Sequence, residues 1–336
     1  MRKIYKYIIP ALFVLWLTGC TDEQAVEPQL PEKQVVLKLF AKGNITSRII
    51  DSDNTAEEQT INNLSVFFTD PSSDAVTHKF VYSGFSEVSD YKLVTLPLDP
   101  ATLGTKDIYV VANCDNELAL NAVQTIDDLK LLTTSKVNKN LLLLPSNGIA
   151  MYGSTAAFDF NLGSRKEAVV TVVRTCAKYR LKLTFPDNPQ LSSDNRFLIA
   201  NAATYTYIIR NEKAVLTDND YFTYASAIPL VDNGSQAYTY SAYVYEASRI
   251  PRLYFYTHAD SSTDKREYSV DLPVPFRNYL YDILLEVYES ASDSRTRTAN
   301  SGSNASQMCR MSVNTYDGNG ELVSYQSTEL HSDKVN

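Results

Sequence analysis

Short stretches in which hydrophobic and polar residues alternate are the main pattern of this chain. In the first of them, residues 35–40 (VVLKLF), Val35, Leu37 and Leu39 share one face. A period of two is typical of a half-buried β-strand. Comparable stretches recur at 61–68, 79–82, 91–98, 108–112, 169–173, 179–185, 204–209, 238–245, 252–256, 268–272 and 279–287. Short strands separated by turn residues predict β-sandwiches.

A single window breaks the strand pattern. Thr125 precedes Ile126, Asp127 and Asp128, and apolar residues recur at helical spacing from 123 to 132. Thr125 suits an N-cap, and acidic residues suit the first turn of a helix. We therefore expect a mainly β fold with one or two short helices.

The alternation pauses at residues 160–168, where a domain boundary is placed. The chain is predicted to hold two β-sandwich domains of transthyretin-like or Greek-key type, at 34–165 and 166–336. Residues 289–307 are rich in Ser, Thr and Asn, and we expect a loop there. Within the 289–336 tail, 308–315 and 322–326 can form a hairpin around Asp317-Gly318-Asn319-Gly320.

The first residues have the features of an export signal. Arg2, Lys3 and Lys6 precede an apolar run at 8–17, which is shorter than the about 20 residues that a membrane-spanning helix needs. The run ends in Leu-Thr-Gly-Cys, which resembles a bacterial lipobox and makes Cys20 the predicted lipidation site. We expect a signal peptide at 1–19 and a lipidated tether at 20–33. Thr21-Asp22-Glu23-Gln24 resembles the surface-export signal of Bacteroides-group lipoproteins, so the predicted location is the outer face of the outer membrane.

Composition narrows the function further. The chain has 31 Lys and Arg against 39 Asp and Glu, a net charge of −8, which argues against a nucleic-acid partner. Past Cys20, three cysteines remain (Cys114, Cys176 and Cys309), without C-x-x-C spacing, so neither a disulfide framework nor a metal site is predicted. The nucleophile-elbow, P-loop and dinucleotide motifs are missing from the sequence. We therefore predict no enzyme activity and no cofactor.

The tyrosine-rich stretch at 238–245 supports two interpretations. Tyr238, Tyr240, Tyr243 and Tyr245 could form a platform on which sugars stack, or they could supply sandwich core and cross-strand pairs. Because they alternate between two faces of a strand, the second interpretation is favoured.

Several segments resemble the fimbrillins of Bacteroides-type bacteria, the FimA-like subunits of type V pili, in the order that this family shows. The resemblance extends from the lipobox to about residue 288. Its segments are 35–38 (VVLK), 108–113 (IYVVAN), 148–153 (GIAMYG), 173–178 (VRTCAK), 243–246 (YVYE) and 277–281 (RNYLY).

The resemblance implies a mode of assembly. Fimbrillins are exported as lipoproteins, an arginine-specific protease cuts the loop after the first strand, and a segment of another subunit fills the groove. Here Val35, Leu37 and Leu39 would be the core residues of the displaceable strand. Arg48, the one Arg in the 43–60 loop, would be the cleavage residue, with Lys42 as another basic site. An ordinary, permanent first strand would instead suit an anchor subunit.

The C-terminal end departs from the family pattern. Polymerising members continue with further strands that often include a Trp, whereas the single Trp here is Trp16 in the signal peptide. The candidate donor contacts are Met311, Val313, Leu322 and Val323.

The sequence therefore predicts a structural subunit of a cell-surface fimbria, assembled by donor-strand exchange, with a role in adhesion. Expected partners are other fimbrial subunits, the outer membrane through the lipid on Cys20, the processing protease, and a host or bacterial surface ligand. The alternatives are a non-polymerising anchor or tip subunit, a surface carbohydrate-binding lipoprotein, and a secreted hydrolase built on a β-sandwich.

Overall fold

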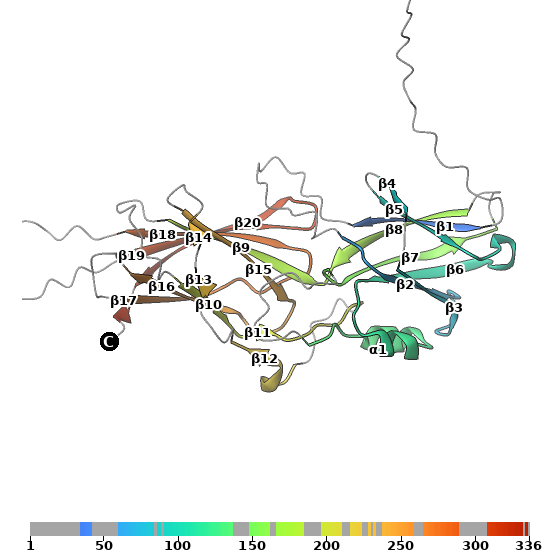
Figure 1. Cartoon of the computed structure of the whole chain (residues 1–336), viewed down its shortest axis with the longest axis horizontal. Helices are drawn as coiled ribbons and strands as arrows, with labels where there is room; N and C mark the ends of the chain where they lie inside the picture. Colours follow the sequence, from blue (N-terminus) through green and yellow to red (C-terminus); the bar gives the residue numbers. More distant parts are fainter. Residues whose placement is uncertain are drawn as a thin grey trace, which may run out of the picture. The chain divides into compact units, whose positions relative to one another are not determined.

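The computed structural model describes residues 34–41, 60–83, 86–88, 91–136, 148–161, 166–184, 196–209, 216–223, 228–229, 231–232, 237–258, 265–288, 308–331 and 333–334. These residues lie in one unit that runs from Lys33 to Asn336 (Figure 1). The predicted signal peptide, lipidated tether and cleavage loop lie outside the described residues.

Eight strands make up the first sheet. In spatial order they are β3 (Val76–Tyr82), β2 (Leu64–Thr69), β6 (Thr105–Ala112), β7 (Met151–Asp159), β8 (Lys166–Arg174), β1 (Val35–Ala41), β5 (Tyr91–Leu96) and β4 (Ser86–Val88). β7 and β8 pair at two positions, Met151 with Arg174 and Tyr152 with Val173. One core cluster joins residues of β1, β5 and β8 to residues of β2 and β6. The two ends of the sheet therefore face each other across a shared core, as in a sandwich.

Two short helices cover the other face of β2 and β6. They are α1 (Glu117–Ala122) and α2 (Ile126–Leu131), and a 3-10 turn, η2 (Pro100–Thr102), precedes β6. Thr125 is the N-cap of α2, as the sequence predicts, and it forms a reciprocal capping box with Asp128. Phe67 and Val111 pack against the helices, so β2 is buried on both faces.

The second half contains two larger sheets and one small one. The six-stranded sheet, in spatial order, contains β14 (Val231–Asp232), β15 (Ala237–Tyr245), β9 (Cys176–Thr184), β18 (Leu280–Tyr288), β19 (Met308–Tyr316) and β20 (Leu322–His331). The five-stranded sheet contains β13 (Ile228–Pro229), β10 (Arg196–Ala200), β16 (Arg252–His258), β17 (Lys265–Asp271) and β21 (Asp333–Lys334). β11 (Ala202–Ala203) pairs with β12 (Tyr221–Phe222), which follows the 3-10 turn η3 (Asp218–Asp220).

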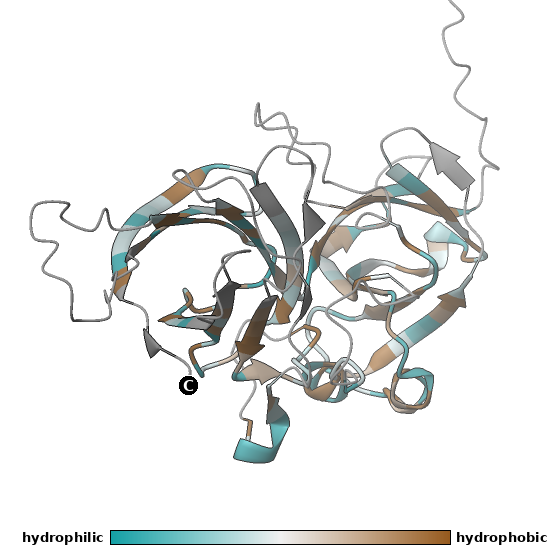
Figure 2. Cartoon of the chain, turned by 60° about the vertical axis from the view of Figure 1, so that its left-hand side comes forward, coloured by the Kyte–Doolittle hydropathy of each residue, from teal (hydrophilic) through white to brown (hydrophobic). Residues whose placement is uncertain are grey.

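One hydrophobic core fills the space between the six- and five-stranded sheets. In Figure 2 the strands of this half curve around a common interior and carry hydrophobic segments. Aromatic rings make up much of this core: Tyr179 stacks on Tyr281 at 4.9 Å, and Phe255 stacks on Tyr268 at 4.7 Å. Tyr179, Tyr268 and Tyr281 are thus part of the hydrophobic core.

The structure confirms a mainly β fold with two short helices and corrects details of the sequence prediction. Residues 204–209, predicted as a strand, form an extended connection with a single bridge from Tyr207 to Thr133. Its backbone bonds go instead to the segment after α2, since Thr134 donates to the Thr206 carbonyl and Ile208 donates to Leu132. Strands β7 and β10 and helix α1 have too short or too mixed a pattern to stand out in the sequence.

The change from the first sheet to the second falls at Thr175. β8 belongs to the first sheet, where it pairs with β1 from Lys166 to Val172, whereas the sequence pattern places the change near residue 165. β7 and β8, the strands on either side of that position, therefore belong to one sheet. The division of the chain into two domains stays a prediction.

No helix among the described residues is long and apolar enough to span a membrane.

Candidate functional site

The first strand, β1, lies inside its sheet and not at an edge. It pairs antiparallel with β5, where Leu37 lies opposite Val94, and parallel with β8, where Leu37 lies opposite Ala168. Loss of β1 would leave unpaired backbone donors and acceptors along both neighbours. A replacement strand would have to pair with β5 and β8 at once.

The core face of β1 carries the three residues that the sequence singles out. Val35, Leu37 and Leu39 are each 0% exposed and pack in the core of the first half. At about 1.5–3 kcal/mol for each aliphatic side chain, their burial contributes roughly 5–9 kcal/mol before the costs of ordering the strand. The alternation that predicted this strand thus reflects a real core face, while its displacement stays a prediction.

The outer face of β1 carries a polar contact to both neighbouring strands. Lys38 Nζ lies 2.8 Å from Oε1 of Glu167 on β8 and 5.0 Å from the ring centre of Tyr91 on β5. Both charged side chains are largely covered, at 17% and 24% exposed. Phe40 also packs on Tyr91, with 5.4 Å between ring centres. Sequence reasoning missed Glu167 and Tyr91 because their partners lie far away in the chain.

The residues predicted to be processed lie outside the described residues. These are Arg48 and Lys42 in the loop after β1, and Cys20 in the lipidated tether. The structure does describe where that loop rejoins the fold, at Thr60.

Asn113 holds the chain at this point. Its side chain donates to the carbonyls of Thr60 (2.7 Å) and Ile149 (3.0 Å) and accepts from the backbone N–H of Asn62 (2.8 Å). Asn113 is 3% exposed and has a φ of 54°, a left-handed conformation that Asn tolerates. Gly148 leaves room for it, because a Cβ there would lie 2.6 Å from Asn113 Nδ2. Two segments that carry the fimbrillin resemblance, 108–113 and 148–153, therefore meet to anchor the far end of the loop.

The C-terminal hairpin divides the four predicted donor contacts into two pairs. Met311 and Val313, on β19, are buried in the core of the second half. Leu322 and Val323, on β20, are 59% and 56% exposed. β20 is the last strand of its sheet, paired on one side with β19, and it is exposed over most of its length. Of the two strands, β20 is therefore the one whose contacts are available to another molecule.

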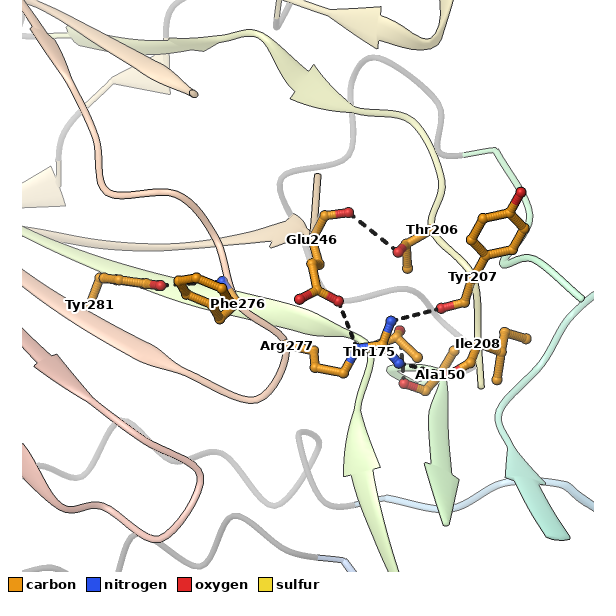
Figure 3. A network of polar contacts seen from close by, with 9 residues as sticks. All are labelled: Ala150, Thr175, Thr206, Tyr207, Ile208, Glu246, Phe276, Arg277 and Tyr281. Atoms are coloured by element: carbon orange, nitrogen blue, oxygen red, sulfur yellow. Dashed lines mark hydrogen bonds and ion pairs between the residues drawn. The ribbon is translucent and has the colours of Figure 1, made fainter. Parts of the chain in front are cut away.

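Arg277 ties the second half to the connection that reaches the first (Figure 3). Its guanidinium donates to Oε2 of Glu246 (2.8 Å) and to the carbonyls of Ile208 (3.0 Å) and Tyr207 (3.2 Å). The Glu246 side chain is 6% exposed and the Arg277 side chain is 12% exposed. The segments 243–246 and 277–281, which also carry the fimbrillin resemblance, thus meet in a buried ion pair with a structural role.

Two of the described cysteines and the carboxylate of Asp128 have local structural surroundings that shift their pKa values. Burial raises the pKa of the Cys114 thiol to about 11 and that of Cys309 to about 12, so neither forms a thiolate readily. Asp128 caps its helix, and backbone donation from Gln124 lowers its pKa. Within the described residues, no group of three or more His, Cys, Asp or Glu is placed to hold a metal ion.

Two of the tyrosines of β15 pack against other parts of the fold and do not form an exposed platform for sugars. The ring of Tyr240 packs on Phe197 with 4.6 Å between centres, and burial raises the pKa of Tyr240 to about 12. Burial also raises the pKa of Tyr245. The favoured interpretation as core and cross-strand pairs fits these contacts.

These features define a mainly β protein with an internal first strand and an exposed edge strand near its C-terminal end. Residues 34–166 match the family model of the major fimbrial subunit protein (FimA). The minor fimbrium tip subunit MfA4 of Porphyromonas gingivalis is 25% identical over 230 residues, which cover 62% of this chain and 67% of that protein. The resemblance to the fimbrillins that the sequence indicates is confirmed.

Solved structures share the fold at lower identity. The tip fimbrial protein Mfa3 of Porphyromonas gingivalis superposes with a TM-score of 0.53 at 13% identity, over 88% of this chain and 99% of that one. A fimbrial assembly protein from Parabacteroides distasonis gives 0.52 at 14% identity, over 87% and 98%. At this identity the solved structures show a shared fold, while the family match covers residues 34–166.

Proposed function

We propose that this chain is a fimbrial subunit that is exported as a lipoprotein and assembles by donor-strand exchange, with β1 as the strand that is removed. The observation that carries this proposal is the position of β1. It lies between β5 and β8, with three fully buried aliphatic side chains on one face. A strand supplied by another subunit can restore both the backbone pairs and the side-chain packing.

The position of the predicted cleavage residue fits this proposal. Arg48 follows β1 by seven residues, and Asn113 fixes the chain again at Thr60. A cut between these points would release β1 and leave β2 anchored. Repetition of the exchange would build an open, head-to-tail filament.

Limited trypsin treatment of the purified full chain tests the proposal. We expect preferential cleavage after Arg48, followed by slow formation of oligomers that resist SDS. Arg48→Ala should abolish both the cut and the oligomers, whereas the matched Lys42→Ala variant should behave like wild type. Complete cleavage after Arg48 that leaves a stable monomer with β1 still bound would contradict donor-strand exchange.

A tip or anchor position in the fimbria is the second candidate. It is favoured by the hairpin, in which Met311 and Val313 are committed to the subunit's own core, and by the similarity to a tip subunit. A subunit in such a position would accept a strand without donating one, or would retain β1. Cross-linking in surface-sheared fimbriae separates these cases, because a tip subunit is joined to one neighbour and a stalk subunit to two.

A further inference from the structure

The groove around β1 has a feature that apolar burial does not explain. A strand that slips by two residues keeps the same side chains on the core face, since side chains alternate along a strand. Val35, Leu37 and Leu39 are all aliphatic and similar in size. Core packing alone is therefore a weak guide to the register of an inserted strand.

Lys38 supplies the missing information on the outer face. It reaches Glu167 on β8 at 2.8 Å and the Tyr91 ring on β5 at 5.0 Å, so a single cation contacts both walls of the groove. A slip by two residues would move this cation by about 7 Å. In one direction it would leave Glu167 for the position of Phe40, and in the other it would leave Tyr91 for the position of Val36, which lies opposite Glu167. Only one register keeps both contacts. Neighbouring outer-face positions on β8 are the exposed Val169 and Thr171, which offer no second carboxylate.

Resting on the function proposed above, we infer that Glu167 and Tyr91 form a register-setting site that selects a donor strand carrying Lys or Arg at the position of Lys38. The strand it fits has apolar residues on both sides of that cation and a further apolar residue three positions before it. The ammonium or guanidinium group pairs with the Glu167 carboxylate and lies over the Tyr91 ring.

The chain's own exposed edge strand does not meet this requirement. The sequence from Met311 to Asp333 contains no Lys or Arg, and β20 carries the acidic residue Glu329. A copy that donated β20 would offer Glu167 no cation. β19 does contain Arg310 between Cys309 and Met311, but both neighbours are buried in the subunit's own core. Neither β19 nor β20 of a second copy therefore fits the groove, and the occupant that we assign is a strand of a different subunit.

Peptide uptake by the full chain tests this inference. The chain would be cut at a sequence-specific protease site inserted after Arg48, so that β1 is held without a covalent link. Labelled peptides are then added: residues 34–42 (QVVLKLFAK), the same peptide with Lys38→Met or Lys38→Glu, and residues 321–330 (ELVSYQSTEL). Uptake is measured in the wild-type chain, in Glu167→Lys, and in the control Thr105→Lys, which adds a positive charge at an exposed position on β6.

We expect the unchanged 34–42 peptide to be taken up best by the wild-type chain. Lys38→Met should weaken uptake about threefold, and Lys38→Glu by about tenfold or more, because like charges would meet in a partly covered site. In the Glu167→Lys chain the order of the unchanged and Lys38→Glu peptides should reverse, while Thr105→Lys should keep the wild-type order. The 321–330 peptide should bind at least about tenfold more weakly than the 34–42 peptide.

The outcomes separate this inference from the proposed function. Equal uptake of the unchanged and Lys38→Glu peptides in all chains would overturn the register-setting site and leave strand exchange intact. Equal uptake of the 321–330 and 34–42 peptides would overturn the assignment to a different subunit. No uptake of any peptide, with β1 still bound, would contradict the displacement of β1 itself, and the inference would fall with it.

Discussion

The first strand and the last long strand of this protein occupy opposite kinds of position. β1 is paired on both sides, and its Val35, Leu37 and Leu39 side chains are 0% exposed. β20 is paired on one side, and its Leu322, Val323 and Tyr325 side chains are 56–61% exposed. Loss of β1 would open the core, whereas β20 can pair with another molecule and leave the core intact. A strand that replaces β1 must therefore match both its backbone pairing and the packing of its core face.

Truncation of one side chain in each strand gives the largest expected contrast. Leu37→Ala should destabilise the protein by about 2–5 kcal/mol, because it removes buried methyl groups and leaves a cavity. The matched variant Leu322→Ala should stay within about 0.5 kcal/mol of wild type. Urea unfolding of the three proteins measures both effects. Equal costs for the two variants would contradict the difference in burial on which the comparison depends.

Removal of the anchor behind β1 comes next in size. Asn113→Ala should cost about 2–3 kcal/mol, because it leaves the Thr60 and Ile149 carbonyls and the Asn62 N–H without their buried partner. It should also speed proteolysis at residues 60–63, as followed by mass spectrometry of the fragments.

Asn201→Ala is the control for the anchor. Asn201 has a similar φ of 58°, but a single long bond of 3.4 Å to the Ile250 carbonyl. Its loss should cost about 1 kcal/mol, mostly from backbone strain in the left-handed region. If the two variants were equally stable, backbone strain and not the hydrogen bonds would be the main effect at Asn113.

The outer face of β1 should contribute less than its core face. Lys38→Met should destabilise the intact chain by about 0.5–1 kcal/mol, through loss of the Glu167 ion pair and the Tyr91 ring contact. The difference from wild type should shrink at high salt. Lys130→Met, which removes the more exposed pair with Asp127, should change stability less. A larger effect for Lys130 would show that cover by neighbouring strands does not strengthen the Lys38 pair.

Acid should weaken a contact far from β1 by a small amount. The hydrogen bond from Lys136 holds the pKa of Asp220 at about 2, below its ordinary value of 3.8. The charged carboxylate therefore stabilises the fold above about pH 4, and this stabilisation is lost as the pH falls toward 2. Denaturation midpoints at pH 5 and pH 2 should differ less in Asp220→Asn than in wild type. An identical pH dependence in the two proteins would contradict this assignment.

The parts of the fold that the sequence predicts well are those set by local patterns. Alternation around Leu37 predicts β1, because one face of that strand is buried, and Thr125 predicts the start of α2 as an N-cap before two acidic residues. Contacts between segments that are far apart in the chain do not produce a recognisable pattern in the local sequence. The parallel pairing of β8 with β1 is one such contact, and it moves the change of sheet to Thr175. Residues 204–209 have the composition of a strand, but they form hydrogen bonds with the segment after α2 and with Arg277.

The candidate site divides in the same way. Val35, Leu37 and Leu39 could be chosen from their spacing, since a period of two marks a strand face. Glu167 and Asn113 could not, because their roles depend on partners on other strands. Asn113 does lie at the end of the segment that carries the clearest fimbrillin resemblance, so the resemblance marked the residue without revealing its contact.

The most direct test of the account is mass spectrometry of the N-terminus of this protein in fimbriae sheared from the cell surface. If β1 is removed during assembly, the first residue will be Ile49 and no peptide from 34–48 will remain with the subunit. A subunit that is incorporated into fimbriae with an acylated Cys20 and an intact 34–48 segment would contradict the removal of β1.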